Sequence, residues 1–494
     1  MKRELEYYLQ QRRKMLAMHY VDFVVGWDNQ TDAAENSILA NSEQAAVLSE
    51  MEYVMTTDPK FEKAVAHLFE NRDKLDEVLR HEIEEVHKGI ANTKKIPMEE
   101  YTAYSELVSK AYPVYVRAKN ENNFELFAPY LEKIVDFCRK KTVWLATDEL
   151  KGYDVLLDSF EPHYTQEKYD VFFDVLREKL VPFVKAKTQT PPAVPQWAQQ
   201  KFDKEKQREF CEYLRDVLCF DKTRGIMKES EHPFTSGFGT DDVRITNHYY
   251  EDNLASAIFS AIHETGHATY EQQCDKSLNG TFSGGGASLG MHESQSRFYE
   301  NVIGRSHAFW EVHYPKLQKL FKKELKAVSV DEFVAYVNRA ERSFVRTEAD
   351  ELTYPLHVML RYEIEKKVIS GELEARDLPK YWKDKFTEYF GITPPTDTLG
   401  VLQDVHWAYG EFGYFPTYAL GSAIASQLFY HMNKDFDVEE SLKDGNTKKI
   451  NEWLRERVHK YGSSKYPDEI LRLATGEDFN ANYYVDYLIS KYSK

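Results

Sequence analysis

A helical repeat of apolar residues runs through almost the whole chain and constrains its fold more than any other feature. From residue 1 to about residue 183, long segments rich in Glu, Lys, Leu and Ala place apolar residues at positions i, i+3, i+4 and i+7, with Gly or Pro between them. This spacing puts the apolar side chains on one face of an α-helix. Segment 441–494 has the same pattern. The sequence therefore predicts a mainly α protein.

Two segments interrupt the helical pattern. Segment 185–196 contains three prolines within five residues, which excludes a helix and favours extended backbone. It is either a loop or a boundary between two helical parts. Segment 232–253 contains glycines and alternates around Val243 and Ile245, which predicts a short hairpin or a pair of strands. Asn253 is suited to cap the helix that follows.

Composition and charge exclude several classes of protein. With 42% hydrophobic residues, the chain is not disordered as a whole. The 81 acidic and 64 basic residues give a formal charge of −17, which repels nucleic-acid phosphates. We find no apolar stretch typical of a secretory signal or a membrane span, so neither nucleic acid nor a membrane is expected as a partner. Four scattered cysteines without a CxxC pair favour a reducing, cytoplasmic setting.

The sequence HETGH at 263–267 is the strongest chemical signal. His263 and His267 are four residues apart, so on a helix both imidazoles reach one zinc ion at about 2.1 Å. Glu264 lies beside them, where it can accept a proton from the water that a catalytic zinc activates. The pattern arises by chance in about one such chain in twenty, but the amphipathic segment 254–262 before it favours a functional site. The two histidines of 81–87 are six residues apart, and we expect that segment at the surface.

A catalytic zinc needs a third protein ligand and one open position. Glu293 lies 26 positions after His267 and begins a helical segment after the glycine-rich connector 283–288. A carboxylate from a following antiparallel helix would complete a His-His-Glu set and leave the fourth position open. Spacing alone leaves two alternatives. Glu293 is a solvated residue at a helix start, or its neighbour His292 is the ligand.

Segment 404–418 holds candidates for binding the substrate backbone or the developing oxyanion. It is dense in aromatic residues and glycines, and it contains His406 and Tyr418. Tyr and His side chains can stabilise an oxyanion, although each is more often a packed residue. Arg346 lies in an acidic stretch, where an ordinary ion pair is the default interpretation.

Six motifs occur in order along the chain, and together they are far more specific than one HExxH. They are HPF at 232–234, DVRIT at 242–246, HETGH at 263–267, HESQ at 292–295, VRTEAD at 345–350 and GVLQDVHW at 400–407. The sequence resembles the carboxypeptidase Taq family of zinc metallocarboxypeptidases, peptidase family M32, along essentially its whole length. Two positions depart from expected patterns. Val345 stands where the family's IRxxAD motif has isoleucine. Arg297 stands where many other HExxH enzymes, which carry an ExxxD motif after the HExxH, have the aspartate.

The resemblance implies a role for each candidate residue. It implies zinc, with cobalt as an alternative ion, held by His263, His267 and Glu293. Glu264 would be the general base and later the proton donor. Arg346 would clamp the terminal carboxylate of the substrate, since guanidinium binds carboxylate in a bidentate manner. The implied contacts to the oxyanion or the substrate backbone are Tyr418, His232 and His406.

The resemblance also implies a fold and an activity. Relatives are mainly α, with a large helical body, a deep groove between two halves, a very small β-sheet beside the HExxH helix and a homodimeric assembly. We expect residues 1–494 to form a single catalytic unit; a subdivision, if there is one, falls near 185–196, between a helical N-terminal half and a metal-site C-terminal half. The expected activity is a metal-dependent carboxypeptidase acting on peptide substrates.

Two alternatives remain for the function. One is an oligoendopeptidase of similar helical groove architecture, which would also cut peptides with blocked ends. The other is a non-catalytic peptide-binding protein with a structural metal. Glu264 disfavours the second alternative, because a structural site needs no base and normally fills its fourth position with protein.

Overall fold

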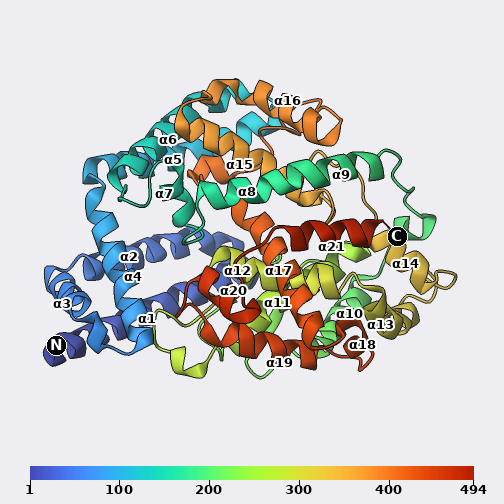
Figure 1. Ribbon diagram of the computed structural model, residues 1–494, viewed down its shortest axis with the longest axis horizontal. Helices are drawn as coiled ribbons and strands as arrows, with labels where there is room; N and C mark the ends of the chain where they lie inside the picture. Colours follow the sequence, from blue (N-terminus) through green and yellow to red (C-terminus); the bar gives the residue numbers. More distant parts are fainter. Residues whose placement is uncertain (494) are drawn as a thin grey trace.

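The computed structural model describes residues 1–493, with the side chains of all of these except 35, 38, 39 and 42. Most of the described residues lie in helices, which confirms the predicted mainly α fold. In Figure 1 the helices gather into an upper half and a lower half, and α1–α4 extend to the left of the lower half. We use these two terms below.

The upper half is an assembly of helices from the middle of the chain. They are α5 (Met98–Asn120), α6 (Phe124–Trp144), α7 (Tyr153–Asp158), α8 (Gln166–Val175), α9 (Val181–Lys187), α15 (Tyr354–Ser370) and α16 (Leu378–Phe390). The proline-rich segment leaves this half: α9 ends at Lys187 and the next short helix begins at Gln196, so the predicted break in the helical pattern is confirmed. Whether it separates two sub-units of the fold stays a prediction.

The N-terminal helices have a small core of their own. They are α1 (Lys2–Thr31), α2 (Ile38–Thr56), α3 (Pro59–Glu70) and α4 (Glu77–Lys95). The buried apolar side chains of this core are Tyr8, Met15, Phe61, Val65, Leu68 and Ile83, and Phe282, just before the glycine-rich connector, packs against them.

The surface prediction for 81–87 is wrong for Glu82. Only 2% of this residue is exposed. Its carboxylate accepts hydrogen bonds from Tyr8 Oη at 2.6 Å, Arg12 Nη1 at 2.8 Å and the backbone nitrogen of Phe282 at 2.8 Å. Helical spacing within α4 does not reveal that α1 and a distant connector cover this carboxylate.

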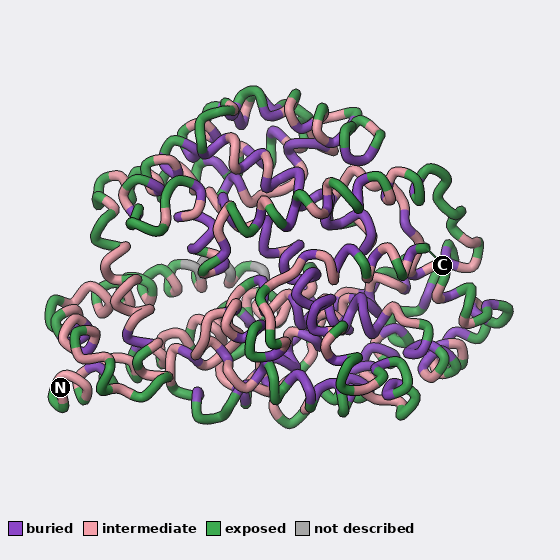
Figure 2. Tube along the Cα trace, viewed as in Figure 1, coloured by how far each residue is buried: buried purple, intermediate pink, exposed green. Residues whose placement is uncertain are grey.

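The lower half holds the remaining helices. They are α10 (Lys204–Val217), α11 (Leu254–Gln273), α12 (Leu289–Arg297), α13 (His307–Leu320), α14 (Val330–Val337), α17 (Pro416–Asp435), α18 (Val438–Leu442), α19 (Lys448–Arg457), α20 (Pro467–Thr475) and α21 (Asn482–Tyr492). Figure 2 shows buried chain concentrated around the middle of this half, where α11, α12 and α17 lie. The helices predicted for 441–494 are confirmed.

A three-stranded sheet is the only sheet among the described residues. Its strands are β1 (Gly225–Glu229), β2 (Thr235–Gly237) and β3 (Val243–Asn247), in the order β1-β3-β2. β2 and β3 are antiparallel, which confirms the hairpin predicted in 232–253. β1 pairs with β3 in parallel and lies before the predicted segment, so the sequence analysis missed it.

None of the described helices combines the length and the apolar character that crossing a bilayer requires. All four cysteines are free thiols, as their scattered positions predicted.

Helix α12 packs between α11 and α17, and it lies unusually close to the backbones of both helices. A Cβ atom on Gly266 of α11 would lie 2.8 Å from Ser296 Cα and 3.0 Å from Gln295 O, both in α12. A Cβ on Gly421 of α17 would lie 2.8 Å from both Cβ and Cγ of Glu293. These two glycines therefore let three helices pack with their backbones almost in contact at the point where Glu293 stands.

Glu161 joins the upper half to the start of α12. It follows α7, and its side chain is fully buried. One carboxylate oxygen accepts from Ser288 Oγ and the other from the backbone nitrogen of Gly290, both at 2.7 Å. Burial raises the pKa of Glu161 from 4.5 to about 7. The carboxyl group thus accepts from one backbone donor and one side-chain donor at a helix N-terminus.

Replacing Glu161 by Gln should alter how stability depends on pH. Between about pH 4.5 and pH 7 the folded protein keeps a proton on Glu161 that the unfolded chain releases, so this group makes the protein less stable as pH rises. The effect has a ceiling of roughly 3 kcal/mol. We expect the stability of Glu161→Gln relative to wild type to increase across this range, as measured by urea unfolding.

Glu167→Gln, an exposed carboxylate in α8, is the matched control. A difference between Glu161→Gln and wild type that stays constant from pH 4.5 to pH 7.5 would contradict the assignment.

Candidate metal centre

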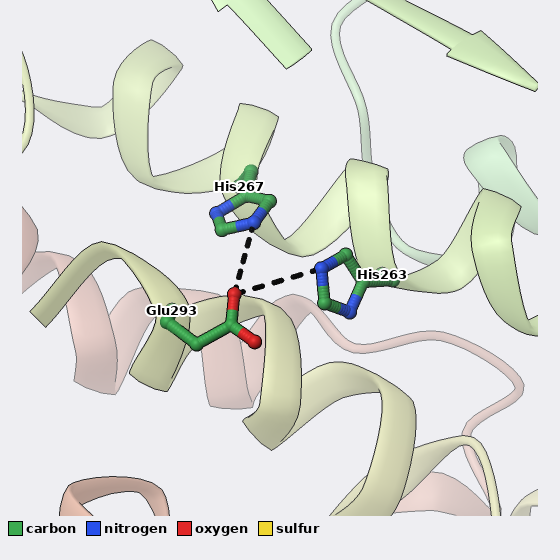
Figure 3. Close-up of side chains that lie close together, drawn as sticks. All are labelled: His263, His267 and Glu293. Atoms are coloured by element: carbon green, nitrogen blue, oxygen red, sulfur yellow. Dashed lines mark ion pairs between the residues drawn. The ribbon is translucent and has the colours of Figure 1, made fainter. Parts of the chain in front are cut away.

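Three predicted ligand residues meet between α11 and α12. One ligand atom each from His263, His267 and Glu293 lies within 4.8 Å of the others, the only such group among the residues that the structure describes. Glu293 Oε2 is 3.7 Å from His263 Nε2 and 3.5 Å from His267 Nε2 (Figure 3). Two ligands of a tetrahedral zinc ion at 2.0–2.1 Å are about 3.4 Å apart. The donor set and its spacing therefore fit a small divalent cation.

Arg297 orients the carboxylate of this group. Its Nε donates to Glu293 Oε1 at 2.7 Å, while Oε2 faces the two histidines. Burial opposes ionisation of Glu293, but Arg297 and His263 hold the pKa of its carboxyl group well below the usual range. Glu293 thus presents one ionised oxygen to the cation site. Arg297, the residue that departs from the ExxxD motif, thus contacts the candidate ligand Glu293 directly.

His267 is supported by a chain of buried groups. Its Nδ1 is 2.6 Å from His292 Nδ1, and His292 Nε2 is 2.7 Å from Glu271 Oε1. Burial lowers the pKa of His267 to about 3, so its ring is neutral. With Nε2 facing the cation site, Nδ1–H donates to His292, whose Nε2–H donates to Glu271. Both ring nitrogens of His292 are therefore engaged, and it supports a candidate ligand instead of joining the group.

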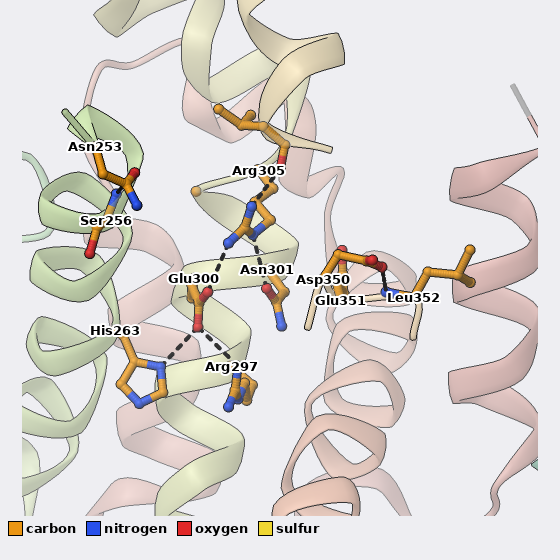
Figure 4. Close-up of polar contacts among 12 residues, drawn as sticks. Asn253, Ser256, His263, Arg297, Glu300, Asn301, Arg305, Asp350, Glu351 and Leu352 are labelled. Atoms are coloured by element: carbon orange, nitrogen blue, oxygen red, sulfur yellow. Dashed lines mark hydrogen bonds and ion pairs between the residues drawn. The ribbon is translucent and has the colours of Figure 1, made fainter. Parts of the chain in front are cut away.

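His263 is supported by a second carboxylate. Glu300 Oε2 is 2.9 Å from His263 Nδ1, and the same carboxylate accepts from Arg297 Nη1 at 3.2 Å and Arg305 Nη2 at 3.0 Å (Figure 4). Although burial opposes ionisation, Arg297, His263 and Arg305 hold the pKa of Glu300 far below its usual range. A metal-binding histidine commonly donates its other N–H to such an acceptor, which sets the tautomer.

Glu264 lies on α11 beside the candidate ligands and is buried. Its Oε2 accepts a hydrogen bond of 2.6 Å from Thr235 Oγ1 on β2. Burial raises the pKa of this carboxyl group. The small sheet therefore orients the predicted base.

Arg346 belongs to a buried cluster of charges. Its Nε and Nη2 donate to Asp404 Oδ1 at 3.1 and 2.9 Å, and its Nη1 donates to Tyr354 Oη at 3.1 Å. Arg361 Nε donates to the other oxygen of Asp404 at 2.7 Å. Two guanidinium groups thus share one carboxylate, so this is more than the ordinary ion pair that the sequence indicated.

A short path of side chains connects Arg346 with the candidate metal ligands. The guanidinium of Arg297 lies 4.6 Å from the ring centroid of Tyr354, whose hydroxyl accepts from Arg346. Arg297 in turn bonds Glu293. The carboxylate-binding candidate and the metal-binding candidates are therefore parts of one site.

The structure brings two of the three remaining candidates to this site. His406 Nε2 is 3.4 Å from Tyr418 Oη, and the guanidinium of Arg346 lies 4.8 Å from the Tyr418 ring centroid. His232 lies between β1 and β2, is exposed, and its imidazole forms no hydrogen bond with any described residue. Its role stays a prediction.

The supporting roles of several residues escaped the sequence analysis, although three of these residues carry a readable signal. Arg297 and Glu300 follow Glu293 by four and seven positions, which places them on one face of a helix. Glu271 follows His267 by four positions in the same way. Thr235 reaches Glu264 only through the packing of β2 on α11, for which the sequence has no local signal.

Comparison with known proteins identifies the family. The family model described as Carboxypeptidase Taq (M32) metallopeptidase matches residues 7–492. This chain belongs to that family. Carboxypeptidase 1 of Bacillus subtilis (strain 168) is 42% identical over 479 residues, covering 96% of this chain and 95% of that protein. Thermostable carboxypeptidase 1 of Pyrococcus furiosus is 36% identical over 488 residues, covering 97% and 96%.

Solved structures agree with this assignment. The structure of Pyrococcus furiosus carboxypeptidase in the Apo-Mg form has a TM-score of 0.95 at 34% identity, with 99% of each chain covered. The crystal structure of M32 carboxypeptidase from Deinococcus radiodurans R1 has a TM-score of 0.94 at 30% identity, again with 99% of each chain covered. The protein is thus a metallocarboxypeptidase with the mainly α M32 fold, and these relatives support neither the oligoendopeptidase nor the non-catalytic alternative.

Replacing His292 by Phe should weaken metal binding without removing any candidate ligand. The variant deletes the acceptor for His267 Nδ1–H and leaves Glu271 with only the backbone nitrogen of Gly286 as a donor. Loss of such a supporting group typically lowers metal affinity about 10- to 100-fold. Competition with a chromophoric chelator measures the dissociation constants for Zn²⁺ and Co²⁺.

His431→Phe is the control, because His431 bonds Glu477 near the other end of α17. Metal affinity of His292→Phe equal to that of this control would show that the His292 chain has no part in metal binding.

Proposed function

We propose that this M32 carboxypeptidase binds one Zn²⁺, or Co²⁺ in its place, through His263, His267 and Glu293. Two imidazoles and a carboxylate are a typical donor set for catalytic zinc, and the spacing of the three groups supports this choice. When bound, the ion acts as a Lewis acid and lowers the pKa of a bound water. The remaining chemistry belongs to side chains of the chain itself.

Glu264 is the general base and later the proton donor. Its carboxylate is held by Thr235 beside the candidate ligands, so it stands ready to accept a proton from the attacking water. It then delivers that proton to the nitrogen of the leaving amino acid.

Arg346 binds the terminal carboxylate of the peptide. The observation that carries this role is the buried cluster in which Arg346 and Arg361 share only Asp404, which leaves one positive charge without a counterion in the cluster. A buried charge without a counterion costs free energy, and the carboxylate of a bound peptide supplies the missing negative charge. Bonds to Asp404 and Tyr354 use three of the five guanidinium N–H groups, and a bidentate carboxylate needs the remaining two.

Tyr418 and His406 are the donors for the oxyanion or the substrate backbone. Burial raises the pKa of Tyr418, so its phenol keeps the proton that it would donate. Burial also lowers the pKa of His406 to about 4, which leaves a neutral ring with one N–H. Such fixed donors stabilise charge that develops during the reaction. His232 is a third contact, from the loop between β1 and β2.

The wider setting is also part of the proposal. Free cysteines are consistent with a reducing cytoplasm, and the family resemblance supports a homodimer in which each chain is one catalytic unit over 1–494. Peptides are the substrates, and their free C-termini are the groups that Arg346 selects.

Replacing Glu264 by Gln should abolish turnover while metal binding persists. The amide oxygen of Gln can still accept from Thr235, but the side chain no longer accepts a proton from water. General-base catalysis is worth about 10²- to 10⁴-fold in rate, so kcat should fall by at least about 100-fold. Peptide hydrolysis and metal content by mass spectrometry are measured on the same preparation. Full activity in a zinc-loaded variant would overturn the assigned role.

Replacing Arg346 by Ala should reduce hydrolysis of peptides with a free C-terminus. Loss of a charged, bidentate contact predicts a decrease in kcat/KM of about 100-fold. Asp404 keeps Arg361 as its partner, so the cluster loses its excess positive charge and no buried carboxylate is left unpaired in the variant. The assay follows one peptide and its C-terminal amide by mass spectrometry, with a chelated sample as blank.

Arg376→Ala removes an exposed arginine and is the matched control. If the wild-type enzyme cleaves the amide as fast as the free acid, the clamp is wrong, and internal cuts would revive the oligoendopeptidase alternative.

A further inference from the structure

Glu365 is a buried carboxylate that binds segment 404–418. It lies in α15, and its side chain is fully buried. Its Oε1 accepts a hydrogen bond from Trp407 Nε1 at 2.7 Å, and its Oε2 accepts from the backbone nitrogen of Gly413 at 2.8 Å. Tyr153 Oη of α7 donates to Oε2 at 2.5 Å. Two of the three donors thus belong to the segment that carries His406 and Tyr418.

The two donors of the segment depend on Glu365. Trp407 and Gly413 are buried, and the carboxylate is the only acceptor of the indole N–H and of the Gly413 N–H among the described residues. Gly413 has φ +101°, and a Cβ on it would lie 2.8 Å from Leu156 O in α7. A buried N–H group without an acceptor costs free energy. Glu365 therefore holds the segment at two points, one of them in close contact with α7.

His406 lies in the turn that these contacts close. Its carbonyl oxygen accepts from the backbone nitrogen of Glu411 at 3.1 Å. Before His406, the carboxylate of Asp404 accepts from Arg361 Nε at 2.7 Å. Arg361 and Glu365 are four residues apart in α15, so both project from one face of that helix. Helix α15 thus holds the segment on both sides of His406.

The His406 ring has few side-chain bonds of its own. Its Nδ1 is buried and has no hydrogen-bond partner among the described residues. Its Nε2 is 3.4 Å from Tyr418 Oη, which is long for a hydrogen bond. The ring packs on Phe415, with 4.4 Å between the two centroids. The position of the imidazole therefore depends mainly on the backbone of the turn.

We propose that Glu365 is a positioning residue for peptide hydrolysis and acts through His406 by fixing the turn that carries it. This role rests on the catalytic role proposed for His406. A fixed donor needs no reorganisation during the reaction, so a donor displaced by about 1 Å contributes much less to the rate. Burial raises the pKa of Glu365 to about 7. Measurements at pH 8.5 therefore examine the ionised carboxylate.

Replacing Glu365 by Gln tests this role with little change in volume. An amide has only one acceptor oxygen, so its NH₂ group faces either Trp407 Nε1–H or the N–H of Gly413. One of the two contacts with the segment is thus lost. We expect kcat/KM for a peptide with a free C-terminus to fall at least tenfold. Glu363→Gln in the same helix, whose carboxylate pairs with Arg177, is the matched control and should keep the wild-type value.

A double-mutant cycle with His406→Phe separates positioning from a general loss of structure. Phenylalanine keeps an aromatic ring but has no N–H donor. We expect Glu365→Gln to lower kcat/KM at least tenfold in the wild type and less than twofold in His406→Phe, because residues that act together are not additive. An equal decrease in both backgrounds, or no decrease in the wild type, would show that Glu365 does not act through His406.

Trp407→Phe serves as a second variant. It removes one donor of the same carboxylate without leaving a buried N–H group unpaired. If Glu365→Gln does not fold, Trp407→Phe completes the same cycle with His406→Phe, and the same non-additive result is expected.

The position of the His406 ring is measured independently of activity, by NMR of protein with ¹³C-labelled histidine. The signal of His406 is the one that His406→Phe lacks. We expect this signal to shift in Glu365→Gln and in Trp407→Phe, which keeps the charge of Glu365, and to stay in place in Glu363→Gln. An unshifted signal in Glu365→Gln would overturn the positioning role. Wild-type activity of His406→Phe, together with a shifted signal, would instead refute the catalytic role of His406 and leave the structural contact intact.

Discussion

The contact of α12 with its two neighbours is the constraint on which the rest of the site depends. Gly266 and Gly421 remove the side chains that would separate α12 from α11 and α17. Helix packing therefore fixes the position of Glu293 Cβ, independently of the contacts of its carboxylate. From this position the carboxylate reaches both histidines of α11. A larger residue at either glycine would force the helices apart, because Ser296 Cα and Glu293 Cβ, which it would meet, are fixed by the backbone of α12. Packing thus places Glu293, and electrostatic contacts only refine its orientation.

Charge is distributed differently in the two parts of the site. Around the candidate ligands, Glu293 and Glu300 are balanced by Arg297 and Arg305, so these four side chains carry no net charge. A divalent cation there would keep its positive charge for polarising a carbonyl group. Around Asp404, in contrast, two arginines face one carboxylate, and the excess is positive. The first arrangement suits a Lewis acid, and the second suits an anionic chain end.

The parts that the sequence predicted are those encoded by local spacing. His263 and His267 are neighbours on any helix, and the helical pattern around them is strong. The parts it missed depend on contacts between distant segments. Glu82 is indistinguishable from a surface residue until α1 covers it, and β1 becomes recognisable as a strand only by pairing with β3. Charge balance at Asp404 is likewise visible only when Arg361 and Arg346, which lie 43 and 58 positions before it, are brought to its carboxylate.

If Arg346 is the carboxylate clamp that we propose, its connection to the candidate metal ligands explains how the site acts on chain ends. Arg346 and Glu293 are linked through Tyr354 and Arg297 by contacts between side chains that are themselves buried or held by ion pairs. Tyr354 lies in α15, and Arg297 and Glu293 lie in α12. Arg346 lies in a short turn between α14 and α15 and is held there by its bonds to Asp404 and Tyr354. Under that proposal, a peptide whose carboxylate is held at Arg346 can place only bonds near its terminus beside His263, His267 and Glu293. Selection of the terminal bond then follows from the fixed separation between Arg346 and the candidate metal ligands. It requires no contact between Tyr354 or Arg297 and the side chain of the amino acid that is released.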